Sequence, residues 1–132
     1  MLSILFLSLA GICNAIMDSI LFHWDKSIFK GSKLEWWANP KVSYKNKWKN
    51  HSNSEDGEKF SGSSTIFVWV TDLWHFAQSF MITFFVLGVL LYDGIVVIKG
   101  YPLVSLLIDF VILKGVFSLT FELFWSKILK KK

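Results

Sequence analysis

The sequence contains no arginine, a single cysteine and only one long polar stretch. Because Cys13 has no second cysteine to pair with, an intramolecular disulfide framework is excluded. The absence of arginine excludes the planar guanidinium groups that hold phosphates in a bidentate manner. The sequence also lacks a CxxC or HExxH zinc pattern and a phosphate-binding glycine loop. The short polar stretch leaves no room for a separate soluble catalytic domain.

Apolar residues are gathered in three blocks, each close to or above the ~20 residues with which a helix crosses a bilayer. The blocks predict membrane spans at about 2–22, 65–92 and 103–126. Open sheets are excluded from lipid because their edge backbone groups would stay unpaired. We therefore predict an all-α integral membrane protein. Its single membrane domain, residues 1–132, has three transmembrane helices and one basic, aromatic cytoplasmic loop at about 31–63.

The distribution of lysine predicts the orientation, because short cytoplasmic loops collect lysine. With all three spans retained, the polar loop and the C-terminal tail share one side, and Lys99 lies alone on the other. We predict a multi-pass protein of the cell inner membrane with its N-terminus outside and its C-terminus in the cytoplasm. The alternative is a signal peptide that ends at Ala15, but residues 1–15 lack a basic n-region. The cytoplasmic lysines in the favoured topology are Lys26, Lys30, Lys33, Lys41, Lys45, Lys47, Lys49, Lys59, Lys127, Lys130, Lys131 and Lys132.

The first half of the polar loop alternates lysine with aromatic and aliphatic residues. This mixture suits a surface that lies on anionic headgroups, with rings inserted and ammonium groups turned outward. Membrane lipids are therefore predicted partners, although an ordinary positive-inside loop explains the same pattern. No nucleic-acid motif accompanies the lysines, and nucleic acid is not a predicted partner. The predicted membrane-surface residues are Trp36, Trp37, Tyr44, Lys45, Lys47, Trp48 and Lys49.

Acidic residues and a histidine recur near the cytoplasmic ends of the three predicted helices. Asp72 and His75 lie one helical turn apart, and Asp18 and Glu122 fall at a similar depth in the first and third helices. Carboxylate and imidazole ligands suit a divalent metal ion, which turns bound water into a nucleophile. We predict a divalent-metal site of Asp18, Asp72, His75 and Glu122, with Asp72 and His75 as its catalytic residues. If the second span begins at Leu73 instead, Asp72 and His75 lie in the headgroup zone, where polar side chains cost little.

Polar residues of the third helix form two faces. Lys114, Ser118 and Glu122 share one face at helical spacing, and Asp109 belongs to another face in the outer half of the span. For Lys114 and Glu122 we expect a structural ion pair to a neighbouring span rather than catalysis. Asp109 has no such partner in the pattern.

The segments SYKNKWK, EKFSGSSTIFV and TDLWH follow one another along the chain. In this order they resemble an uncharacterised family of small membrane proteins from bacteria and their phages. The resemblance covers about the middle third of the chain and implies no activity, ligand or catalytic residue. It implies that the loop from Ser43 to Lys49 and the turn from Asp72 to His75 form one unit.

Three functions remain open on these residues. The first is a metal-dependent membrane enzyme acting on lipid headgroups, or a proton relay built from the same groups without metal. The second is a channel or proton-coupled carrier, formed as a homo-oligomer, with Asp109 and Lys114 extending a polar path. The third is an adaptor or inhibitor that binds another membrane protein. Gly11, Ala15 and Ser19, spaced by four, offer it a close-packing seam.

Overall fold

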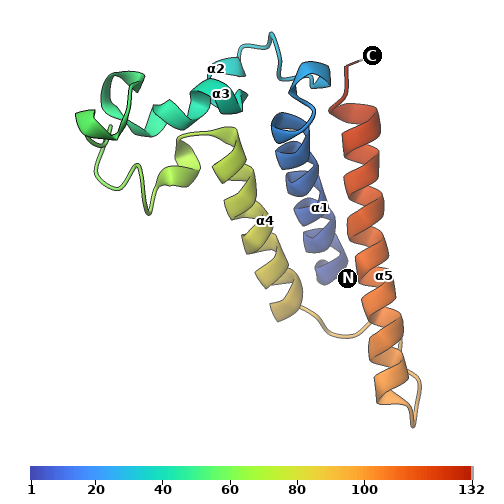
Figure 1. Ribbon diagram of the computed structural model, residues 1–132. Coiled ribbons are helices and arrows are strands. Elements are labelled where there is room, and N and C mark those ends of the chain that lie inside the picture. The colour runs from blue at the N-terminus through green and yellow to red at the C-terminus, as the bar shows by residue number, and fades with distance from the viewer. Residues whose placement is uncertain (132) are drawn as a thin grey trace.

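The computed structural model describes residues 1–131 and shows three long helices and two short ones (Figure 1). The long helices are α1 (Leu2–Leu21), α4 (Leu73–Leu90) and α5 (Pro102–Leu123), and a π-helical turn, Phe124–Ile128, continues α5. The short helices α2 (Glu35–Ala38) and α3 (Pro40–Ser43) lie in the connection from α1 to α4. All three long helices are long and apolar enough to cross a membrane. The predicted all-α fold with three spans is confirmed.

One helix end differs from the sequence prediction, whereas α1 ends at Leu21, next to the predicted end at residue 22. The second span begins at Leu73 rather than near residue 65, because Asp72 caps the helix and residues 65–71 form tight turns. This start is the alternative that places Asp72 and His75 at the edge of the span.

α1 is the central helix and packs against both α4 and α5 (Figure 1). Glycine permits the close approach on each side, as is common where membrane helices pack. A Cβ atom on Gly11 would lie 2.7 Å from the carbonyl oxygen of Phe117 in α5, and one on Gly88 of α4 would touch Leu7 of α1. The Gly11, Ala15 and Ser19 seam is buried in the chain's own fold. It is therefore not free for a partner.

Different segments of the chain lie at the two ends of the helix bundle. The connection from α1 to α4 and the C-terminal tail lie together at one end, and the N-terminus and the connection from α4 to α5 lie toward the other (Figure 1). This is the relative arrangement that the lysine distribution favours. Which end faces the cytoplasm stays a prediction.

The connection between α1 and α4 is held by backbone and side-chain hydrogen bonds. A core of Ile20, Ala38 and Leu73 joins the end of α1, α2 and the start of α4. Further along, Trp48 and Glu58 form an isolated antiparallel bridge, and the Glu58 carboxylate accepts hydrogen bonds from residues 62 and 64. The connection is therefore a folded layer that lies above α4 in Figure 1.

Candidate functional site

Asp72 caps α4. The residue has extended backbone angles, and its Oδ1 accepts a hydrogen bond from the backbone N–H of His75 at 2.9 Å. Aspartate is favoured here because it satisfies a free N–H group and because its charge suits the positive end of the helix dipole. Asp72 is 3 % exposed. A carboxylate is therefore held almost out of solvent at the first turn of the span.

The second carboxylate oxygen of Asp72 orients the imidazole ring of His75. Its Oδ2 lies 2.6 Å from His75 Nδ1 and 3.4 Å from the hydroxyl of Thr71. With an ionised carboxylate as acceptor, Nδ1 carries the proton and Nε2 is left as the ring's acceptor. About a third of the His75 side chain is exposed. The buried carboxylate therefore fixes the direction of the imidazole ring.

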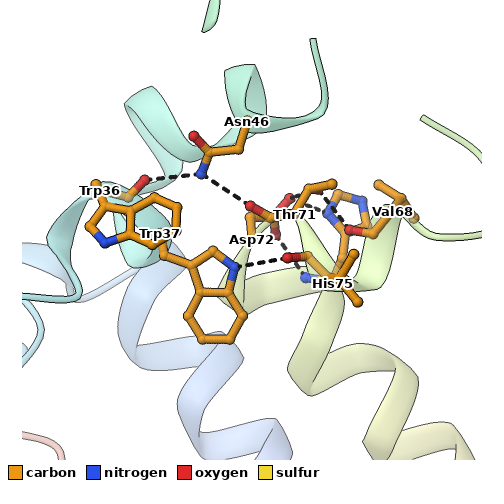
Figure 2. A network of polar contacts seen from close by, with 8 residues as sticks. Trp36, Trp37, Asn46, Val68, Thr71, Asp72 and His75 are labelled. Carbon is orange, nitrogen blue, oxygen red and sulfur yellow. Dashed lines mark hydrogen bonds and ion pairs between the residues drawn. The ribbon is translucent and has the colours of Figure 1, made fainter. Parts of the chain in front are cut away.

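Residues from the connection between α1 and α4 close over this pair (Figure 2). The Asn46 amide donates to the Thr71 carbonyl at 3.0 Å and to the Trp36 carbonyl at 3.1 Å. The Trp37 indole N–H donates to the Val70 carbonyl at 3.4 Å. The loop around Asn46 and the turn before α4 are thus joined in one unit. We call Trp36, Trp37, Asn46, Thr71, Asp72 and His75 the α4 cap network.

The structure does not bring the four predicted metal ligands together. Within residues 1–131 no three His, Cys, Asp or Glu side chains are placed to hold a metal ion. Asp72 and His75 meet, but Asp18 lies 3.6 Å from the ring of His23, and Glu122 is exposed on α5. The prediction relied on equal depth along three helices. Depth does not fix the direction in which each side chain leaves its helix, and this direction separates the ligands.

The predicted membrane-surface residues divide into exposed and packed side chains. Trp36 and Tyr44 have about half of their surface exposed, 58 % and 49 %, and Lys49 is also exposed. Trp37 is half-buried instead, and its ring lies 5.4 Å from that of Phe76 in α4. Trp37 therefore belongs to the packing of the connection on α4.

Lysine and aromatic side chains also pair within this segment. The Lys45 ammonium lies 5.9 Å from the centre of the Tyr44 ring, and that of Lys47 lies 5.4 Å from the Trp48 ring. Each pair combines an aromatic face with a cation, a contact that lends modest stability at exposed sites. That these pairs contact lipid stays a prediction.

Asp109 has a role that the sequence pattern did not reveal. It is 1 % exposed and accepts hydrogen bonds from the Tyr92 hydroxyl at 2.5 Å and from the N–H groups of Ile95 and Val96 at 2.8 and 2.9 Å. The hydrogen bond to Asp109 raises the pKa of Tyr92 above its ordinary value. Asp109 thus fixes the connection between α4 and α5. No local signal links residue 109 to residues 92–96, because the contact is tertiary.

Lys114, Ser118 and Glu122 are all exposed on the outer face of α5. We call these three residues the α5 stripe. Within residues 1–131 neither Lys114 nor Glu122 forms an ion pair, so the expected pair to a neighbouring span is absent from the described chain. Lys114 and Asp109 are five residues apart and leave the helix in different directions. One chain therefore does not place them on a common polar path.

No family model, curated protein or solved structure matches this chain.

Proposed function

We propose that the protein binds another membrane-spanning protein and that α5 is its docking helix. The observation that carries the proposal is the α5 stripe, which puts Lys114, Ser118 and Glu122 on a surface where lipid would otherwise lie. Lys114 lies near the middle of the Pro102–Ile128 span. A charged side chain at that depth costs ~2.5–3.5 kcal/mol or more when lipid surrounds it. A partner that pairs with the charge removes this cost.

The packing of α5 supports the same proposal. Asp109 is the one buried residue among the 22 of α5, whereas α1 has residues buried along its whole length. Gly115 lies beside the stripe, and a Cβ atom there would meet no other atom within 4 Å. A helix with a small residue beside a polar stripe suits close packing with another membrane helix. The outer face of α5 is therefore a better docking surface than the occupied α1 seam.

Charge favours a different protein over a second copy as the partner. Copies inserted in the same orientation place identical residues at identical depths. Symmetric contact through the stripe would therefore put Lys114 against Lys114 and Glu122 against Glu122. Like charges facing each other in a medium of low dielectric repel strongly. The complementary partner is a membrane-spanning helix with an acidic side chain at the depth of Lys114.

Site-specific photo-crosslinking in the native host membrane tests this proposal. A photoreactive residue at Val111, next to the stripe, should give a hetero-adduct that is lost in Lys114→Leu. The matched position is Leu123, which is also exposed but lies on another side of α5. Equal adducts from both positions, or an adduct of twice the chain mass, would contradict the proposal.

In liposomes, a polyleucine helix with one central aspartate should associate with the wild type and not with Lys114→Leu.

A second candidate function is general-base catalysis at the membrane surface by His75. It is favoured by the 2.6 Å contact from His75 Nδ1 to the buried Asp72, which leaves Nε2 as a directed base. Lipid turnover by the purified protein should then fall in His75→Gln and in Asp72→Asn, and Asn retains the helix cap. Asp93→Asn is the matched control for Asp72→Asn, because Asp93 is an exposed carboxylate outside the α4 cap network. Absence of turnover by the wild type on anionic and zwitterionic phospholipids would reject this function.

A further inference from the structure

A pocket of about 90 Å³ lies where the end of α1 meets the end of α5. One water molecule needs only ~10–15 Å³ of such space, so the pocket has room for a larger polar group. It is separate from the α4 cap network and from the α5 stripe. Its polar and aromatic lining comes from both ends of the sequence: Ser19, His23, Lys26, Ser27, Trp125 and Lys130.

Backbone hydrogen bonds build this pocket by joining the C-terminal tail to the segment after α1. The Ile28 N–H donates to the Leu129 carbonyl at 2.9 Å, and the Lys131 N–H donates to the Lys26 carbonyl at 2.7 Å. Ser27 and Lys130 form an antiparallel bridge between these two bonds. The pairing therefore holds Lys26 and Lys130, from opposite ends of the chain, at one pocket.

The π-helical turn at the end of α5 shapes the other wall. The Leu129 N–H donates to the Phe124 carbonyl at 2.8 Å across this turn, and such turns are frequent at functional sites. The ring of Trp125 meets the ring of His23 edge-on, with their centres 5.1 Å apart. Ser27 is 1 % exposed, and its hydroxyl accepts from the Phe29 N–H, so its own proton remains free to donate.

The pocket gathers positive charge without an acid among its lining residues. Within residues 1–131 neither Lys26 nor Lys130 forms an ion pair, and Asp18, which is not a lining residue, lies 3.6 Å from His23 Nε2. Lys26 and Lys130 are both exposed residues at the rim of one pocket, and an anion bound there would be attracted by both positive charges. We propose that this pocket binds the phosphate group of an anionic phospholipid. Lys26 and Lys130 supply the charge, and the Ser27 hydroxyl supplies a directed donor.

The position of the pocket favours lipid as the source of the phosphate. It lies at the ends of two membrane-spanning helices, on the side of the bundle that carries most of the lysines. Tryptophan is enriched at this depth because its ring suits the headgroup region, and Trp125 is the pocket's aromatic wall. A headgroup phosphate of the adjacent leaflet therefore reaches the pocket without leaving the membrane surface.

Native mass spectrometry of the full chain in mild detergent tests the proposal. The wild type should retain phosphatidylglycerol in preference to phosphatidylcholine at one lipid per chain. Lys26→Gln/Lys130→Gln should weaken this binding about 30-fold. Each lysine contributes ~1 kcal/mol to the attraction of an anionic lipid, and each ~1.4 kcal/mol changes the dissociation constant tenfold. The matched control, Lys33→Gln/Lys59→Gln, removes the same charge from residues outside the pocket. Lys26→Arg/Lys130→Arg keeps the charge and should keep the lipid.

Each outcome of this experiment either supports or overturns the proposal. Lipid displaced by inorganic phosphate, and not by chloride at the same ionic strength, supports recognition of the phosphate group. Equal lipid retention by the Lys26→Gln/Lys130→Gln variant and its matched control would overturn the proposal. Binding of inorganic phosphate without retention of phosphatidylglycerol would also overturn it, because the phosphate would then come from solution.

Discussion

Replacing Gly11 by alanine tests the packing of α1 against α5 most directly. The added Cβ atom would lie 2.7 Å from the carbonyl oxygen of Phe117 and 3.3 Å from the backbone nitrogen of Phe121, whereas ordinary contact begins near 3.4 Å. Both neighbours are backbone atoms, so no side-chain rotation relieves the overlap. α5 as a whole must move away from α1. We expect Gly11→Ala to destabilise the bundle.

The expected change in the free energy of unfolding of Gly11→Ala follows from two opposing effects. Overpacking in a close-packed interior costs ~1–3 kcal/mol. Alanine in place of glycine stabilises a helix by up to ~1 kcal/mol. Gly115→Ala is the matched control, because a Cβ atom there would meet no other atom within 4 Å and only the second effect remains. Gly11→Ala should therefore be less stable than Gly115→Ala by about 1–3 kcal/mol, the overpacking term alone.

Unfolding in mixed micelles, followed by circular dichroism while the fraction of denaturing detergent rises, measures this difference. Gly88→Ala adds an intermediate case, since its nearest neighbour would be the flexible Leu7 side chain at 3.4 Å. The expected order of stability is Gly115→Ala, then Gly88→Ala, then Gly11→Ala. If Gly11→Ala and Gly115→Ala unfold within ~0.5 kcal/mol of each other, the range of neutral surface changes, α1 and α5 are not in close contact.

Two further predictions concern titratable groups outside the spans. Hydrogen bonds from the Ser64 hydroxyl and from the Gly62 and Ser64 N–H groups lower the pKa of Glu58. The stabilisation is therefore present above the carboxyl's unfolded pKa and is lost as pH falls through the folded pKa. The protection of the Gly62 N–H, its exchange rate relative to the intrinsic rate at the same pH, should fall in acid and in Glu58→Gln, and unchanged protection would contradict this. The hydrogen bond to Asp109 raises the pKa of Tyr92. The stability that this bond contributes is therefore present below the unfolded pKa of the tyrosine and is lost as pH rises through its folded pKa. Ultraviolet titration should show one tyrosine ionising late, and Tyr92→Phe should remove that step; if all tyrosines of the wild type titrate together, the bond to Asp109 is absent.

The α4 cap network shows how far the sequence pattern reaches. Asp72 and His75 are three residues apart, so their contact is local, and helical spacing predicted it. The start of α4 was predicted several residues too early, because the apolar residues at 65–70 read as helix although they form turns. Asn46 ties the connection to this site through tertiary hydrogen bonds, and no pattern along the chain pairs it with Thr71.

The number of spans was determined by the sequence alone, because the free energy of placing an apolar run in lipid depends on its own residues. The pairing of the polar ends follows from chain order, because each span in turn returns the chain to the opposite end of the bundle. Only the tertiary structure decided which side chains meet. Rotation of each helix about its axis separates Glu122 from Asp72 and buries Asp109 against the connection from α4. Backbone pairing of the C-terminal tail with the segment after α1 brings Lys26 and Lys130 to one pocket. These directions follow from the packing of α1 between its two neighbours, which no run of residues specifies by itself.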